Sequence, residues 1–203
     1  ANKALLAKHG LELFKIAEKN NVLLLYEAAV AGGIPIIKIL KNNIFLNNIK
    51  KISGILNGTT NYILSKMGEE NLNFDKVLEI AKSKGYTTSN EAELDIGGLD
   101  SAHKLTLLST LCFGSEINFS NNNITGISDV QIHDIINARK LGYKIKLISE
   151  ASIINNQIYC ITAPKLISKN DPLANVDGVL NAINLVTDQL QTLFVEGEGA
   201  GGK

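Results

Sequence analysis

Two aspartates and a lysine lie around a glycine pair in the segment "ELDIGGLDSAHK", which runs from Glu93 to Lys104. Asp100 and Lys104 are four residues apart, so on a helix they share one face. As an exposed pair they would cap a helix and form a surface ion pair worth about 0.5 kcal/mol, without a function. In a pocket, the lysine could exchange a proton with a substrate. Asp95 and the Gly97-Gly98 pair, which permits close approach of a ligand to the backbone, favour the pocket without deciding the question.

Glu27 raises a similar question, because it follows the apolar run "VLLL" and precedes "AAVAGG". A buried, unpaired carboxylate is costly. The side chain therefore emerges into water at the end of a strand, or it meets a cation or several N–H donors. A buried Glu27 could hold a hard cation together with backbone carbonyls of the following turn, since such cations prefer oxygen ligands.

Two further motifs have ordinary explanations as well as functional ones. The segment "NGTTN" places hydroxyls and N–H groups at a predicted helix start, where a ligand carboxylate or carbonyl could bind, or where Thr59 or Thr60 simply caps the helix. The histidines His9, His103 and His133 have no serine or cysteine partner at a suggestive distance, and we interpret them as surface or interface residues.

Composition narrows the class of protein. The chain has 203 residues, of which 45% are hydrophobic, and its 20 basic and 20 acidic side chains give no net charge. No block of one sign is present, which argues against a nucleic-acid partner. The apolar runs are broken well short of a membrane span, and we expect no membrane segment. Two cysteines without metal-ligand spacing suggest a reducing, cytoplasmic setting.

The elements that must position these residues alternate between helix and strand. In the first half of the chain, the patterns predict a helix up to Asn20-Asn21, a buried strand at "VLLLYEAAV", a helix from "NGTT" and a helix capped by Asn73 and ended by Gly85. They then predict a helix capped by Asp100 and ended by Gly114, and a helix from Ser128 to Gly142. A hairpin folded at Asn155-Asn156 and strand pieces from Val176 onward follow. The fold class is α+β (α/β-like), with a mixed sheet covered by helices.

Taken together, the order of several segments is more specific than any one of them. "YEAAVAGGIPII", "GILNGTTNYIL", "GYTTSNEAELDIGGLDSAHK", "GISDVQIHDIINARKLGYKIKLI", "PLANVDGVLNAINLVTD" and "GEGAGG" resemble the homoserine dehydrogenase family over essentially the whole chain. The resemblance implies the catalytic region of a two-domain NAD(P)-dependent dehydrogenase. It places an edge of a truncated nucleotide-binding domain at residues 1–20, the catalytic and dimerisation domain at 21–196 and a glycine-rich return at 197–203.

The family's reaction interconverts L-homoserine and L-aspartate 4-semialdehyde on the route to threonine, methionine and isoleucine. By resemblance, Lys104 and Lys3 are the acid/base lysines, and they can act only if their pKa falls toward neutrality. The resemblance also implies that the substrate is bound by Gly58, Thr59, Tyr86, Glu91, Asp95 and Asp100. It implies that the cofactor is bound by Asn2, Lys3 and Gly199. It further implies a monovalent-cation site, usually occupied by sodium, formed by Glu27 with the main-chain oxygens of Val30, Gly32 and Ile34.

Two departures from the family pattern qualify this expectation. The family has a substrate-binding Glu and then Asp-Pro after its Gly-Tyr pair, whereas here Gly85-Tyr86 is followed by "TTSNEAELD", which leaves Glu91 and Glu93 as alternatives. A nucleotide-binding domain should also precede "ANK", so the chain alone is expected to turn over slowly or not at all. The competing hypothesis is a non-catalytic homologue or an isolated oligomerisation module. The family implies a homodimer through the sheet.

Overall fold

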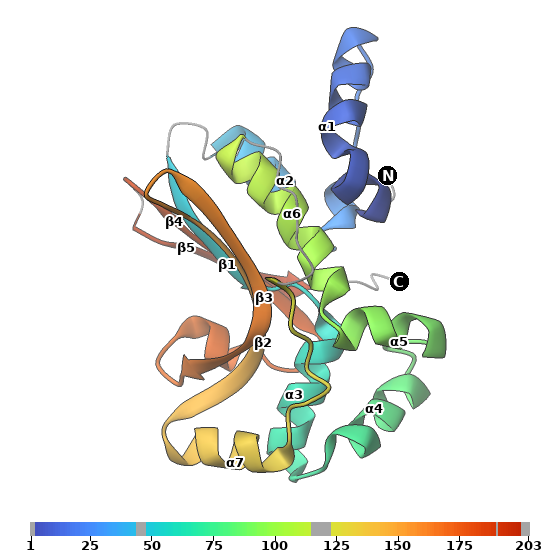
Figure 1. Cartoon of the computed structure of the whole chain (residues 1–203), viewed down its shortest axis with the longest axis vertical. Coiled ribbons are helices and arrows are strands. Elements are labelled where there is room, and N and C mark those ends of the chain that lie inside the picture. Colours follow the sequence, from blue (N-terminus) through green and yellow to red (C-terminus); the bar gives the residue numbers. More distant parts are fainter. Residues whose placement is uncertain (1–2, 44–47, 115–122, 190, 200–203) are drawn as a thin grey trace.

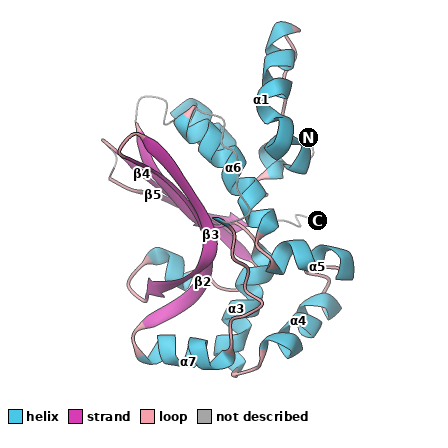
Figure 2. Cartoon of the chain, viewed as in Figure 1, coloured by secondary structure: helices cyan, strands magenta, loops and turns pink. Residues whose placement is uncertain are grey.

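A computed structural model describes residues 3–43, 48–114, 123–189 and 191–199 (Figure 1). One sheet lies beside a group of helices, as the colouring by secondary structure makes plain (Figure 2). The α-helices are α1 (Lys3–Lys19), α2 (Ile36–Lys38), α3 (Gly58–Glu70), α4 (Phe74–Ser83), α5 (Ser89–Ile96), α6 (Leu99–Phe113) and α7 (Ile132–Lys140). The short helical turns are η1 (Glu27–Ala29), η2 (Ile39–Asn43) and η4 (Pro172–Asn175). The strands are β1 (Ile49–Ile55), β2 (Tyr143–Ile154), β3 (Gln157–Ser168), β4 (Leu180–Thr187) and β5 (Leu193–Glu198).

The sheet has the order β3-β2-β1-β4-β5, and each pair of neighbouring strands is antiparallel. The predicted hairpin is confirmed: β2 and β3 join at Asn155 and Asn156, whose φ angles of 50° and 60° suit a tight hairpin turn. The α+β class is confirmed too. The sheet itself differs from the mixed one expected, since among the described residues the parallel pairing is limited to an isolated bridge between Ile124 and Thr162.

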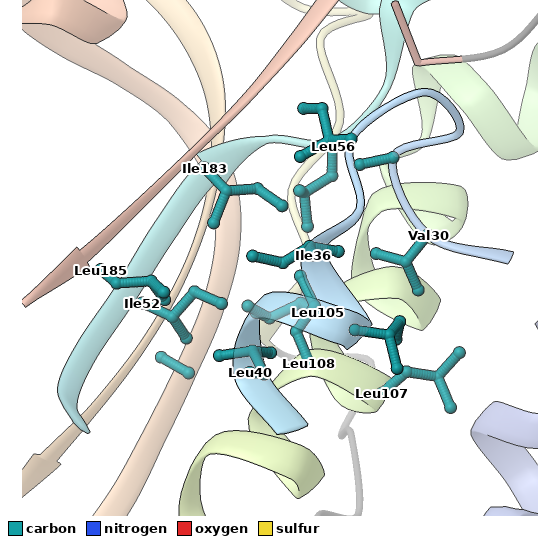
Figure 3. Packing of buried hydrophobic residues seen from close by; sticks show 14 of the residues in the cluster. Val30, Ile36, Leu40, Ile52, Leu56, Leu105, Leu107, Leu108, Ile183 and Leu185 are labelled. Atoms are coloured by element: carbon teal, nitrogen blue, oxygen red, sulfur yellow. The ribbon is translucent and has the colours of Figure 1, made fainter. Parts of the chain in front are cut away.

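The main core lies between one face of the sheet and helices α6, α2 and η2 (Figure 3). Ile52 of β1 and Ile183 and Leu185 of β4 point toward Leu105 and Leu108 of α6. Each of these side chains is almost completely buried, and burial of one such side chain stabilises a fold by about 1.5–3 kcal/mol. The core therefore fixes the middle of α6 against β1 and β4.

A second core joins α3, α4 and α7 to the first half of β2. Two of the helices predicted from sequence, α3 and α4, contribute to it. Asn73 caps α4 by accepting a hydrogen bond from the Lys76 N–H at 3.2 Å, and Gly85 follows the helix end with a φ of 72°. Both predictions are confirmed. The initial helix is confirmed as well, although it is kinked at His9.

The strand predicted at "VLLLYEAAV" is wrong. Val22, Leu23 and Leu25 are 59%, 89% and 77% exposed, and Glu27 begins a short 3-10 turn. An apolar run alone does not distinguish a buried strand from a segment that another structural unit covers. Strand β1 was not predicted, because its second half is buried on both faces and lacks the alternating pattern.

No helix among the described residues combines the length and the apolar content needed to cross a membrane.

Candidate active site

A pocket of about 740 Å³ opens where α5 and the N-terminal ends of α3 and α6 meet the start of β4 and the end of β5. Of the residues predicted to bind substrate, cofactor or protons, the structure brings eight to its wall. These are Gly58, Thr59, Tyr86, Glu91, Asp95, Asp100, Lys104 and Gly199. Segments up to about 140 positions apart in the sequence therefore converge on one cavity.

Lys104 is held inside this pocket and is not a surface residue. Its side chain is 12% exposed, and its Nζ lies 2.8 Å from Oδ2 of Asp100, whose side chain is 9% exposed. The ammonium also donates to the carbonyl oxygen of Leu56 at 2.7 Å. The exposed ion pair considered from spacing alone is therefore excluded.

The predicted helix cap by Asp100 is wrong. Gly98, with a φ of 82°, is the N-cap residue of α6, and the helix begins at Leu99 without a side-chain cap. Asp100 consequently lies inside the first turn, where its buried carboxylate meets Asn57 and Lys104 rather than water. The other end of this helix is confirmed at Gly114.

The side chain of Asn57 connects three elements of the site. Its Oδ1 accepts a hydrogen bond from the Thr60 N–H at 2.8 Å, which caps α3. Its Nδ2 donates to Oδ1 of Asp95 at 2.7 Å and to Oδ2 of Asp100 at 3.0 Å. One amide group thus separates two carboxylates that would otherwise repel each other directly. The predicted cap by Thr59 or Thr60 is replaced by Asn57.

The pKa of Asp95 is raised above the usual value of an aspartate, chiefly because burial disfavours the charged form. Hydrogen bonds from Thr87, whose Oγ1 donates to Asp95 Oδ2 at 2.9 Å, and from Asn57 oppose that shift. The charge of Asp100 adds to it, and Lys104 opposes it. A carboxylate that is destabilised in this way gains when a cationic group enters the pocket.

Thr59 and Tyr86 form part of the pocket wall. The Thr59 hydroxyl donates to the carbonyl oxygen of Tyr86 at 2.9 Å, which ties the start of α3 to the loop after α4. The Tyr86 ring meets the Tyr62 ring edge-on, with centroids 4.8 Å apart. Gly58 is confined, because a Cβ there would lie 2.5 Å from the Val179 carbonyl oxygen.

The structure distinguishes the two glutamates that the sequence left as alternatives. Thr88 caps α5, and its hydroxyl donates to Oε2 of Glu91 at 2.9 Å, so Glu91 stands at the mouth of the pocket. Glu93 is two positions further along the helix and is not among the pocket residues. Side chains two apart on a helix point in widely different directions.

Glu27 neither ends a strand nor is left without a partner. Its two carboxylate oxygens accept hydrogen bonds from the backbone N–H groups of Ile37 at 2.8 Å and Lys38 at 3.1 Å. It thereby satisfies the first turn of α2. The backbone between Val30 and Ile34 turns through positive φ angles at Ala31 (55°) and Gly32 (38°), so successive carbonyls face different directions. Among the described residues, no group of three or more His, Cys, Asp or Glu side chains could hold a metal ion.

The remaining cofactor residues are placed only in part. Asn2 lies outside the described residues, and so do residues 200–203 of the glycine-rich segment. The backbone of Lys3 begins α1, while its side chain is also outside what the structure describes. Gly199 packs so tightly against the Asn181 side chain that a Cβ would overlap it.

Sequence reasoning missed several residues of the pocket wall, namely Asn57, Lys84, Leu94, His103, Val179, Asn181 and Glu198. His103 could have been found, since it lies three positions after Asp100 on the same helix, a spacing that puts both side chains on one face. Asn181 could not, because the strand that carries it is 125 positions from the carbonyl that it contacts, that of Leu56.

A family model described as homoserine dehydrogenase matches residues 35–203. The homoserine dehydrogenase of Neisseria gonorrhoeae is 46% identical over 201 residues, which cover 99% of this chain and 46% of that protein. The homoserine dehydrogenase of Methanocaldococcus jannaschii is 39% identical, with coverage of 99% and 58%. The chain spans about half the length of the curated relatives it matches.

Solved structures give the same similarity in three dimensions. A homoserine dehydrogenase from Thiobacillus denitrificans superposes with a TM-score of 0.93 at 42% identity, over 98% of this chain and 46% of that one. A hyperthermophilic archaeal homoserine dehydrogenase mutant in complex with NADPH gives a TM-score of 0.84 at 31% identity, over 100% of this chain and 58% of that one.

Proposed function

The chain belongs to the homoserine dehydrogenase family, and from that premise we propose that its pocket interconverts L-homoserine and L-aspartate 4-semialdehyde with NAD(P). The observation that carries this proposal is the ion pair of Lys104 and Asp100 inside the pocket, 2.8 Å apart and almost buried, beside a second carboxylate, Asp95. A scaffold without a reaction has no need to bury these charges, since burial of ions is costly.

In the direction of oxidation, Lys104 in its neutral form takes the hydroxyl proton of homoserine. The electron pair of the O–H bond becomes the second bond of the aldehyde, and the hydrogen on the same carbon leaves as hydride. NAD(P), when bound, supplies the hydride acceptor. In the reverse direction the Lys104 ammonium returns the proton to the aldehyde oxygen and NAD(P)H, when bound, would supply the hydride to the aldehyde carbon, so the atoms and charges balance.

Asp95 and Asp100 are proposed to hold the substrate ammonium, with Glu91 at the pocket mouth. The raised pKa of Asp95, caused mainly by burial, is relieved when an ammonium arrives. Gly58 and Thr59, at the start of α3, lie where backbone N–H groups suit the substrate carboxylate. Lys3 is proposed as the second lysine of the acid/base pair.

The pocket has room for the reactive end of a nicotinamide beside a four-carbon amino acid, because its volume of about 740 Å³ lies in the range of cavities that enclose much larger ligands. Gly199, in the pocket wall, would approach the cofactor, as would Asn2 and Lys3. We further propose that residues 1–20 and 197–203 connect residues 21–196 to a nucleotide-binding domain. The exposed Val22 and Leu23 are apolar surface that such a domain would cover. The unpaired cysteines fit a cytoplasmic enzyme.

A monovalent cation, most simply Na⁺, is proposed near Glu27. The donor set would consist only of oxygens, those of the Glu27 carboxylate and the carbonyls of Val30, Gly32 and Ile34, as a hard cation prefers. The two N–H groups bonded to Glu27 use one lone pair of each carboxylate oxygen and leave the others available.

A homodimer through the open face of the sheet is also proposed. Cys160 packs toward α6, so its neighbours Tyr159 and Ile161 point to the opposite face, where they are 50% and 40% exposed. Light scattering of the wild type and of the Ile161→Lys variant tests this. A dimer that becomes a monomer supports it, and a monomeric wild type contradicts it.

The decisive experiment measures homoserine-dependent reduction of NAD and NADP by the full-length protein that carries this chain, alongside its Lys104→Met variant. Activity that falls at least a thousandfold in a folded variant supports the proposal, since general acid–base catalysis contributes roughly 10²–10⁴-fold. An inactive but folded wild type, or an active variant, would favour the non-catalytic homologue or oligomerisation module.

A further inference from the structure

Asp100 and the Leu56 carbonyl, which both bind the Lys104 ammonium, each also accept a hydrogen bond from a buried asparagine amide. Asp100 Oδ2, 2.8 Å from the ammonium, receives the Nδ2–H of Asn57 at 3.0 Å. The Leu56 carbonyl, 2.7 Å from the ammonium, receives the Nδ2–H of Asn181 at 3.3 Å. The two amide donors lie at the N-cap of α3, which is Asn57, and at the start of strand β4, which carries Asn181.

The strand register explains how Asn181 reaches this position. Ile55 of β1 pairs with Ala182 of β4 in an antiparallel ladder, so the next residue, Leu56, lies beside Asn181. Asn181 lies on the same face of β4 as Ile183, which packs against α6. The sheet thus delivers an amide to the carbonyl that Lys104 uses.

An asparagine is energetically unfavourable at position 181. It is completely buried, and its Oδ1 finds no hydrogen-bond donor within the described parts of the chain. Buried polar atoms are nearly always paired, and an unpaired one destabilises the fold. An apolar side chain would avoid that cost, so stability does not account for an asparagine here.

We propose that Asn57 and Asn181 are positioning residues for Lys104, which fix Asp100 and the Leu56 carbonyl and limit how strongly these two groups hold the ammonium form. The physical reason is competition. A hydrogen bond to the charged form favours that form, and an acceptor that already binds an amide offers less to the lysine. The amides thereby offset part of the attraction of Asp100 and favour release of the proton. This inference deepens the proposed function, on which its catalytic meaning rests.

Other charges face the same cavity and would contribute equally to wild type and variants. They are Lys84 after α4, Glu91 and Asp95 on α5, Asp100 and His103 on α6, and Glu198 on β5. The test therefore compares single substitutions that leave all of these groups in place.

The first readout is the titration of Lys104 in the full-length protein, followed by the ¹³Cε NMR signal that disappears in Lys104→Met. In Asn181→Leu the midpoint is expected at higher pH by at least half a unit, and kcat at neutral pH is expected to fall several-fold with KM for homoserine within twofold. Asn181→Ala is the second variant, should leucine not be accommodated. Asn57→Ser, which keeps a capping hydroxyl but loses both amide donors, is expected to shift the midpoint in the same direction.

The matched control is Asn184→Leu. Asn184 lies three positions along β4 on the opposite face of the sheet, and its Oδ1 also lacks a donor among the described residues. It should leave the Lys104 titration unchanged. Equal midpoints in wild type, Asn181→Leu and Asn181→Ala overturn the inference. A shifted midpoint in a protein without homoserine-dependent activity would keep the inference and reject the proposed function.

Discussion

The Lys146 ammonium lies 2.8 Å from Oδ1 of Asp177, and the lysine side chain is only 1% exposed. The same ammonium donates to Asn61 Oδ1 at 3.0 Å, Ser65 Oγ at 3.1 Å and the Val176 carbonyl at 2.6 Å. It thus joins β2 to α3 and to the segment after η4. Burial lowers the pKa of Lys146, and the hydrogen bond and charge of Asp177 oppose that shift.

Replacement of this lysine should be far more damaging than replacement of its neighbour. Lys146→Met leaves buried acceptors without their donor and is expected to lower the free energy of unfolding by about 2–4 kcal/mol. Lys144→Met removes a partly exposed partner of Asp177 and should cost less than about 1 kcal/mol. Urea unfolding of both variants measures the difference. Equal losses would show that the buried network contributes nothing beyond a surface ion pair.

Asp95 gives a stability prediction whose sign depends on pH. Because burial raises its pKa above the usual 3.8, the folded protein binds more protons than the unfolded one between 3.8 and the raised value. Stability contributed by this group therefore decreases as pH rises through that window. Asp95→Asn keeps groups that can pair with Asn57 and Thr87 but cannot ionise. Relative to wild type, its stability should rise from acid to neutral pH.

The same Asp95→Asn protein should bind homoserine worse, with KM raised about tenfold, since a charge-assisted hydrogen bond becomes a neutral one. Urea midpoints at acid and neutral pH, together with KM, check both statements. A variant that loses stability relative to wild type as pH rises, or that keeps its KM, would contradict the role given to this carboxylate.

Glu91 and Glu93 provide a matched pair on one helix. Glu91→Gln removes a negative charge from the pocket mouth but keeps an oxygen for the Thr88 hydroxyl, so α5 should remain capped. We expect KM for homoserine to rise about two- to fivefold, the size of an exposed ion pair. Glu93→Gln should leave KM unchanged. If the effects were reversed, the substrate would lie on the other side of α5.

The cation proposed near Glu27 can be tested by exchange of salts. At equal ionic strength, the melting temperature and activity of the wild type should be higher in sodium chloride than in choline chloride. Glu27→Gln should remove this difference, and the loss of one acceptor for the N–H groups of Ile37 and Lys38 should cost about 1 kcal/mol. A sodium dependence that persists in the variant would place the cation elsewhere.

Local elements of the fold followed from sequence because their causes are local. Asn73 caps α4, the Asn155-Asn156 pair closes the hairpin, and Gly85 and Gly114 adopt the positive φ angles that end helices. These features depend on residues within a few positions of each other. The prediction of a strand after Asn21 was wrong, because the conformation of this segment depends on what covers its apolar side chains.

The motifs around Thr59, Asp100 and Lys104 also identified the family and half of the residues that line the pocket from sequence alone. Only the tertiary structure decided that Lys104 and Asp100 are buried together, that Glu91 and not Glu93 reaches the pocket, and that Asn181 shares the Leu56 carbonyl with Lys104. The physical reason is distance along the chain. Burial and shared acceptors arise where the register of β1 and β4 meets the first turn of α6, and no periodicity within one segment encodes that meeting.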